Sequence, residues 1–433
     1  KIAYVKFGDA SNDAFVKGLK NYADVTVVDA SDINTLKVKL KEFNLVIIGH
    51  HKSNENPWKD YKFSATELNW LQEIAAERTS NLILCVFAKP YALSDINSFQ
   101  NIDAVVMSYQ NSDIAQEKTA EVLFGAVGAS GKLPVSAHSD FPVNSGIKTQ
   151  SLSRLGYSIP ERVGMSSKGL GDIDRMVNDG LDSLMFPGAQ ILVARKGKII
   201  YQKSFGKPTY DSKEKITNDY IYDLASLTKI LATLPMVMKM EEEGKIGLND
   251  TFEELVPNYS DTEIKNVTVL KALSHYGRLP AWIPFYINTL DENRKPSGEF
   301  YRNSLLPGFS TKVYENLYLA DAYKDSIYNR IGRQDLKSNR YRYSDVPYYV
   351  MKKVIEENYS QPLDYLTNNF LYRRLGANHT SYNPLEKFEK NMIVPSEEDD
   401  YYRYGTVQGY VHDMGAAMQA GVGGHAGLFS NSN

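Results

Sequence analysis

Residues 44–51 read NLVIIGHH, and residues 64–80 read SATELNWLQEIAAERTS. The first is a short apolar run, and the second repeats Leu68, Leu71 and Ile74 at helical spacing, so the pair predicts a strand followed by an amphipathic helix. Short apolar strands alternating with helices predict a doubly wound parallel sheet of the flavodoxin-like sandwich type. The same alternation continues through further apolar runs at 1–8, 24–30, 81–87 and 102–109, with helical segments at 12–22, 33–43, 91–99 and 113–128.

The end of the first predicted strand lacks the loop that dinucleotide sites require. It reads FGDASND, without Gly-x-Gly-x-x-Gly, so we expect no Rossmann cofactor site. His50 and His51 close the third strand, where such sheets place ligands, and they are either a ligand-facing pair or polar loop residues. No His-Glu-x-x-His or other zinc spacing occurs, so we expect neither a metal nor a cofactor.

Length and composition set further limits. A chain of 433 residues predicts two or three domains. With a net charge of -3, the chain lacks the excess of positive charge that is typical of nucleic-acid-binding proteins. No apolar run approaches the length of a transmembrane helix. The single cysteine, Cys85, has no partner in the chain and is expected to be buried. The chain starts on a strand-like run without Met, so we expect a cut or designed N-terminus, and the lack of a visible signal peptide leaves the compartment open.

A segment rich in Gly, Pro and Ser ends the first half. Residues 128–146 read GASGKLPVSAHSDFPVNSG. Together with the preceding alternation, residues 124–136 make the region 1–142 resemble the carboxyl-terminal α/β domain of glycoside hydrolase family 3. That resemblance implies an accessory domain whose catalytic barrel is absent from this chain. We expect a linker over 143–163 and a second domain over 164–433.

The second half of the chain does not continue the alternation of strands and helices. Residues 166–183 predict one amphipathic helix, and residues 188–206 predict a β-hairpin around Lys196-Gly197-Lys198. A helix followed by an antiparallel hairpin indicates an α+β domain. Residues 283–340 are polar and tyrosine-rich, and we expect them to form a helical insertion that shapes access for a substrate.

The stretch 222–231, YDLASLTKIL, carries Ser226 and Lys229 at a spacing of three residues. An apolar stripe continues to about Gly244 and predicts a helix kinked at Pro235, so both side chains lie on one face. Lys229 could then act as a neutral base for the Ser226 hydroxyl, with the Ser226 N–H as half of an oxyanion hole. Alternatively Ser226 only caps the helix and Lys229 faces solvent. Three other Ser-x-x-Lys matches begin no apolar helix: 145–148, 204–207 and 212–215.

A second landmark is Tyr343-Ser344-Asp345, which precedes an apolar helix. With the segments 187–206, 222–259, 269–282 and 411–430, it makes residues 160–433 resemble the penicillin-binding-protein-like serine hydrolases. That group includes class C β-lactamases, D-alanyl-D-alanine peptidases and esterases. The resemblance implies Ser226 as nucleophile, Lys229 as base and Tyr343 as proton donor to the leaving group. Asp345 and Trp282 would contact the substrate.

The chain departs from that family in three places. Residues 275–279 read HYGRL where relatives tend to read HTSGL, and Asp345 stands for the usual Asn. An ionised Asp345 could hold Lys229 in its ammonium form, or it could pair with Lys229 as the amine accepts the serine proton. No Lys/His-Thr/Ser-Gly triad occurs. GHAGLFS at 424–430 is either a degenerate form, with His425 binding substrate, or a turn before missing sequence. We therefore expect a β-lactamase-like domain without its last strands and a hairpin with an open edge.

Three functions remain open from the sequence. The leading one is a serine hydrolase acting by acyl transfer on a cell-wall peptide, amide or ester, or another small-molecule or glycopeptide substrate, in the bacterial periplasm or envelope. Its partners could be the missing barrel and carboxyl-terminal strands of the same product. The second is a glycosidase of the β-N-acetylhexosaminidase type with both domains accessory. The third is a degenerate binding domain without catalysis.

Overall fold

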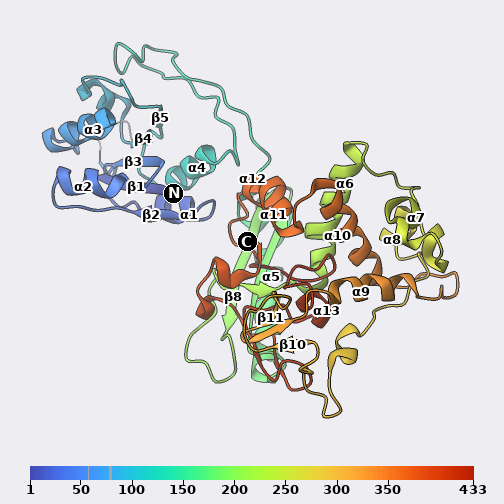
Figure 1. Ribbon diagram of the computed structural model, residues 1–433. Coiled ribbons are helices and arrows are strands. Elements are labelled where there is room, and N and C mark those ends of the chain that lie inside the picture. The colour runs from blue at the N-terminus through green and yellow to red at the C-terminus, as the bar shows by residue number, and fades with distance from the viewer. Residues whose placement is uncertain (57, 78–79) are drawn as a thin grey trace. The chain divides into compact units, whose positions relative to one another are not determined.

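The computed structural model describes residues 1–56, 58–77 and 80–433, which form two compact units (Figure 1). The first unit contains residues 1–170 together with 193–201. The second contains residues 171–192 together with 202–433. Each unit has hydrophobic core clusters of its own and is described separately below.

The first unit is built on a five-stranded parallel sheet in the order β2-β1-β3-β4-β5. Helices α1 and α4 pack on one face with Phe15 and Leu19, and α2 and α3 pack on the other with Leu36 and Leu71. The expected doubly wound sheet is therefore confirmed. The strands are β1 (Ile2–Gly8), β2 (Val25–Val27), β3 (Leu45–His51), β4 (Asn81–Phe87) and β5 (Ala104–Met107), and the helices are α1 (Asp13–Lys20), α2 (Ile33–Leu40), α3 (Ala65–Glu77) and α4 (Asp113–Leu123).

His50 and His51 are not polar loop residues, because both belong to β3 and are fully buried. His51 lies between the Tyr4 hydroxyl at 2.8 Å and the Asn111 side-chain oxygen at 2.7 Å. Burial lowers the pKa of His51 to about 4, so the ring is neutral at neutral pH. His50 is 3.2 Å from the carbonyl oxygen of Tyr61. Both rings thus have partners within the protein.

The predicted hairpin is confirmed as β7 (Gly188–Arg195) and β8 (Lys198–Gly206). Its two-residue turn has Lys196 and Gly197 in the left-handed region, at φ 51° and 71°, which suits the twist of a tight hairpin. Strand β6 (Gly156–Tyr157) pairs with β8, so the sheet order is β6-β8-β7. Within the described residues, no strand pairs with the outer edge of β7. The predicted helix is α5 (Ser167–Asp182).

The second unit packs helices around α6 (Leu234–Glu242) and α10 (Val346–Tyr359). Met236, Val350 and Ile355 belong to its large core cluster and are fully buried. A small sheet of order β13-β16-β9 adjoins them. Its strands are β9 (Tyr222–Asp223), β13 (Ser381–Tyr382) and β16 (Leu428–Ser430). Further elements are α7 (Phe252–Leu255), α8 (Val269–Leu273), α11 (Leu363–Thr367), α12 (Arg373–Leu375), α13 (Met414–Ala417), β14 (Glu397–Asp399) and β15 (Gly405–Val407).

The expectation of a helical insertion over 283–340 is wrong for most of that segment. It contains an antiparallel sheet in the order β10-β12-β11 and one α-helix, α9 (Tyr323–Gly332). The strands are β10 (Tyr301–Arg302), β11 (Thr311–Tyr314) and β12 (Leu317–Leu319). Tyrosine, threonine and valine favour pleated strands, so the tyrosine content of the segment favoured strands rather than helix.

Candidate active site

Ser226 lies on a short 3-10 turn, Ala225–Leu227, directly after β9. Ala225 has a φ of 44°, a left-handed conformation that costs free energy for a residue with a side chain. The turn is held by Asp223, whose carboxylate accepts the Ala225 N–H at 2.7 Å and the His412 N–H at 2.7 Å. The motif analysis missed Asp223, although it lies three positions before the serine.

The chain after Ser226 does not form one regular helix. Residues Lys229–Thr233 form a π-helical turn that leads into α6. Pro235 explains the change, because it has no N–H to donate to the carbonyl of Leu231 one turn earlier. The Tyr372 hydroxyl donates to that carbonyl instead, at 3.0 Å. The predicted irregularity at Pro235 is therefore present, as a widened turn that carries Lys229.

Lys229 is almost completely buried, with 2% of its surface exposed. Its ammonium nitrogen is 2.8 Å from the Ser226 hydroxyl oxygen and 2.6 Å from an Asp345 carboxylate oxygen. A weaker contact reaches the carbonyl oxygen of His425 at 3.4 Å. These three acceptors match the three donors of an ammonium group. The alternative of a solvent-facing Lys229 is wrong.

Asp345 precedes α10, and its own N–H donates to the carbonyl of Ala281 at 2.8 Å. A carboxylate this close favours the charged form of a neighbouring amine. Lys229 contacts both the Ser226 oxygen and the Asp345 carboxylate, and a base that accepts the serine proton needs a free lone pair on its nitrogen. The aspartate at this position therefore bears directly on how the Ser226–Lys229 pair can react.

Tyr343 lies beside the pair, with its ring centre 4.8 Å from the Lys229 nitrogen. The ring is 45% exposed, and its hydroxyl has no hydrogen bond within the described part of the chain. The tyrosine is fixed through its neighbours. His275 accepts the Arg342 N–H with its carbonyl at 2.9 Å and the Ser344 N–H with its ring Nδ1 at 3.3 Å.

His275 also packs its ring against Tyr343, with the ring centres 4.5 Å apart. Burial, with a further contribution from the nearby charge of Lys229, lowers the pKa of His275 and favours the neutral ring that can accept the Ser344 N–H. The His275 backbone is itself left-handed, at φ 62°. The sequence identified His275 only as the first residue of a divergent motif, and its contacts with the Tyr343 loop were missed.

His425 is buried, and its main-chain carbonyl, rather than its imidazole, contacts Lys229. The ring Nε2 lies 2.7 Å from an Asp413 oxygen, and the ring stacks on Tyr349 at 4.3 Å. Burial opposes ionisation of Asp413, but the imidazole and the hydrogen bond from the Ala416 N–H lower its pKa to about 2. A substrate contact by the His425 side chain therefore stays a prediction.

The segment around His425 reaches the nucleophile through close backbone packing. Gly424 approaches α10 so tightly that a Cβ atom there would lie 2.2 Å from the carbonyl oxygen of Tyr348. Beyond it, β16 pairs with β9, and Phe429 is opposite Asp223. The strand that follows His425 thus lies beside the strand that precedes Ser226.

Trp282 lies near the same site and is 54% exposed. It lines a narrow cavity of about 20 Å³ together with Asp345, His425 and Tyr349. Such a space holds about one water molecule and no substrate. A substrate of Ser226 would therefore lie on the accessible side, where Tyr343 and Trp282 are exposed.

Family models match both halves of the chain. Residues 173–433, more than half of the chain, match the family Beta-lactamase. The chain therefore belongs to this family, the class of penicillin-binding-protein-like serine hydrolases expected from its motifs. Residues 8–163 match the Glycosyl hydrolase family 3 C-terminal domain, as the first half predicted.

Among curated relatives, the chain is 30% identical over 306 residues to a putative D-alanyl-D-alanine carboxypeptidase of Escherichia coli K12. The match covers 64% of this chain and 64% of that protein. A relative of the same name from Salmonella enteritidis is 29% identical over 307 residues, covering 64% and 65%. The chain thus spans less than two thirds of the length of these relatives.

Two solved structures that resemble this chain have equal TM-scores. One is the octameric penicillin-binding protein homologue from Pyrococcus abyssi, with a TM-score of 0.43 and 20% identity over 60% of this chain and 53% of that one. The other is a beta-lactamase/D-alanine carboxypeptidase from Pseudomonas syringae, with a TM-score of 0.43 and 15% identity over 60% of this chain and 61% of that one.

Proposed function

We propose that this protein is a serine hydrolase that works by acyl transfer, with Ser226 as the nucleophile. The observation that carries the proposal is the 2.8 Å contact between the Ser226 hydroxyl and the amine of the buried Lys229. Nucleophile and base within hydrogen-bond reach, with the base held by a third group, is the arrangement that activates a weak hydroxyl nucleophile. Here the third group is Asp345.

In the proposed reaction, the Ser226 oxygen attacks the substrate carbonyl carbon while its proton moves to the neutral amine of Lys229. The resulting tetrahedral intermediate collapses, the bond to the leaving amine or alcohol breaks, and that group takes a proton. Tyr343, exposed beside Lys229, is the proposed donor of this proton. The Lys229 ammonium passes the serine's proton on to the Tyr343 phenolate, which restores both groups. Water then attacks the acyl carbonyl, one of its protons goes to the Ser226 oxygen, and the acid is released.

The Ser226 N–H is a proposed donor to the developing oxyanion, because it lies on the turn that opens the helical segment. Asp345 is proposed to hold the Lys229 amine against Ser226 through its ion pair, and Trp282 to contact the substrate from the exposed side. The His425 side chain is proposed to position the segment that carries the carbonyl touching Lys229, through its bond to Asp413.

For the substrate, we propose a peptide ending in D-alanyl-D-alanine or a related cell-wall amide or ester. The names of the curated relatives from E. coli and Salmonella support this class. We also propose that the protein works in the bacterial envelope, where such peptides occur. Of the helices in the described residues, none has the length and apolarity needed to cross a membrane.

The test is D-alanine release from a diacylated tripeptide ending in D-Ala-D-Ala, followed by enzymatic detection of D-alanine. We expect release by the native protein and none by Ser226→Ala. Release by Ser226→Ala at the native rate would refute the serine mechanism. Failure of both proteins on peptide, amide and ester substrates alike would favour the non-catalytic binding alternative.

A second candidate is a role in glycoside hydrolysis, because residues 8–163 match a domain of that class of enzymes. On this alternative, both units support a catalytic barrel outside the chain. Release of nitrophenol from nitrophenyl N-acetylglucosaminide by the full-length gene product tests it. Activity that survives Ser226→Ala would favour this alternative over the first.

A further inference from the structure

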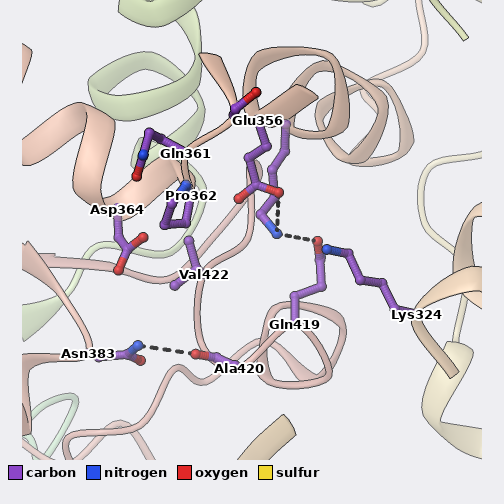
Figure 2. Close-up of a pocket in the computed structure, with 11 residues that line it drawn as sticks. Lys324, Glu356, Gln361, Pro362, Asp364, Asn383, Gln419, Ala420 and Val422 are labelled. Atoms are coloured by element: carbon purple, nitrogen blue, oxygen red, sulfur yellow. Dashed lines mark hydrogen bonds and ion pairs between the residues drawn. The ribbon is translucent and has the colours of Figure 1, made fainter. Parts of the chain in front are cut away.

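A second, larger cavity lies in the second unit, lined by α9, α10, α11 and residues 419–422 (Figure 2). Its volume is about 510 Å³, within the range of small-molecule sites. None of Ser226, Lys229, Tyr343 or Asp345 lines it. Most of the residues that line it are polar or charged, and Pro362 and Val422 are among the apolar ones.

One side of this cavity is cationic. Lys352 projects from α10 and is 4% exposed, with Glu356 at 3.4 Å and the side-chain oxygen of Gln419 at 3.3 Å. Burial lowers the pKa of Lys352, a perturbation that often marks functional clefts. Lys324, on α9, reaches toward Gln419 from the rim (Figure 2). Because Glu356 already pairs with Lys352, Lys324 adds positive charge to this side.

The opposite side is anionic. Figure 2 shows Asp364 and Lys324 on opposite sides of the cavity. The Asp364 Oδ1 atom is buried and has no hydrogen-bond partner within the described residues. The side chain as a whole is partly exposed and lines the cavity, so its negative charge favours a cationic ligand group there. The cavity thus has a negative end and a positive end.

The backbone around the cavity is strained. Ser360, Asn383 and Ala420 all line it, and all three are left-handed, at φ 51°, 43° and 57°. Residues other than glycine adopt this region rarely, and such residues gather at ligand sites and switches. The Asn383 amide secures the loop by donating to the carbonyl of Ala420 at 3.2 Å. Ser360 is also the left-handed residue that ends α10, where this conformation is common, so Asn383 and Ala420 are the two positions that the helix end does not explain.

From this geometry we propose that the cavity binds a short zwitterionic peptide, with its ammonium end at Asp364 and its carboxylate end at Lys324 and Lys352. The separation of the two charges across the cavity selects an elongated ligand with both termini free. Gln361 and Asn383 offer amide groups to the peptide bonds between the termini. The site is separate from Ser226 and does not depend on the proposed hydrolase activity.

The test measures equilibrium binding of trialanine to the full chain carrying Ser226→Ala, so that no turnover occurs. The comparison peptides are N-acetyl-trialanine, which lacks the ammonium, and trialanine amide, which lacks the carboxylate. We expect saturable binding of trialanine by calorimetry, and at least about tenfold weaker binding of each blocked peptide, because each loses a charge-assisted contact.

Two variants test which residues bind each end of the peptide. Asp364→Asn should bind trialanine and its N-acetyl form equally. Lys324→Met should discriminate between trialanine and its amide less than the parent does, because Lys352 remains. Lys324 is exposed on α9, so its variant is expected to fold even if Asp364→Asn does not. Absence of saturable trialanine binding at millimolar concentration would overturn the proposal. So would variants that discriminate among the three peptides as the parent does.

Discussion

The two units each bury a polar network, and the two networks differ in how they are closed. In the first, His51 lies between Tyr4 and Asn111, Asn12 donates to the Tyr4 hydroxyl at 3.1 Å, and Asn111 donates to the Ser11 carbonyl at 2.8 Å. In the second, Lys229 joins Ser226 and Asp345 beside the exposed ring of Tyr343.

The first network holds a neutral histidine whose ring nitrogens both bond to protein, so nothing is left for a ligand. The second holds an ion pair and a hydroxyl at a surface that solvent reaches, since Tyr343 is nearly half exposed. Burial of polar groups is common to both and does not by itself mark a site. The difference is a reactive oxygen with a base beside it and open space in front.

The largest expected effect is on Lys229. Lys229→Met should lower the rate of acylation by about 10²- to 10⁴-fold, because the serine loses its base. Lys352→Met is the matched control, since Lys352 is also a buried lysine of the second unit but contacts Glu356 and Gln419. Stopped-flow acylation by a chromogenic ester measures both, and equal losses in the two variants would contradict the distinction between them.

The first network should respond to pH. The pKa of His51 falls from 6.5 to about 4 on folding, so its contribution to stability is present above pH 6.5 and is lost as the pH drops toward 4. The free energy of unfolding of the first unit should fall by about 3 kcal/mol across that window.

Chemical denaturation at a series of pH values measures this loss. His51→Asn is the control, because a residue without a titrating ring should reduce the pH dependence between 6.5 and 4. The part that remains is the contribution of His50, whose pKa is also lowered by burial. An unchanged slope in the variant would show that another group is responsible.

A smaller effect is expected at His275. His275→Leu should lower kcat by about 10- to 100-fold with little change in KM, because the buried Ser344 N–H loses its acceptor and the Tyr343 loop loses its support. His275→Asn should recover part of the loss, since its side-chain oxygen can accept that N–H. Steady-state kinetics on one ester substrate measures kcat and KM of both variants. Equal losses of kcat in the Leu and Asn variants would rule out positioning through Nδ1.

The smallest effect is expected at Asp345. Asp345→Asn should raise the acylation rate at neutral pH by about 3- to 10-fold, because the anion that favours the ammonium form of Lys229 is removed. Serine labelling followed over time at fixed reagent concentration gives the rate. A slower variant would mean that the carboxylate assists proton acceptance, the other interpretation of this substitution.

The sequence predicted the elements whose cores repeat locally and could not predict contacts that the fold creates over distance. The strand β3 could be predicted from eight consecutive residues, because its apolar run is continuous. The hairpin could be predicted from its turn residues, Lys196 and Gly197. By contrast, Lys229 meets the His425 carbonyl across 196 positions. The contact between Ser226 and Lys229 could be predicted from the sequence because the two residues are only three positions apart.

The other site contacts had no such local signal. His275 acts on the Tyr343 loop partly through its backbone carbonyl, and Asp223 acts by accepting two backbone N–H groups. Backbone contacts leave no residue pattern. The error over 283–340 has a related cause, since strands as short as β10, with two residues, are too brief for a period of two to show.

The central claim is that Ser226 is a nucleophile activated by Lys229, and covalent labelling tests it most directly. The protein is incubated with a fluorophosphonate and with benzylpenicillin, and its intact mass and peptide map are measured. The account predicts one adduct per chain, on the peptide that contains Ser226, and none in Ser226→Ala. An adduct on another residue, or equal labelling of the variant, would contradict it.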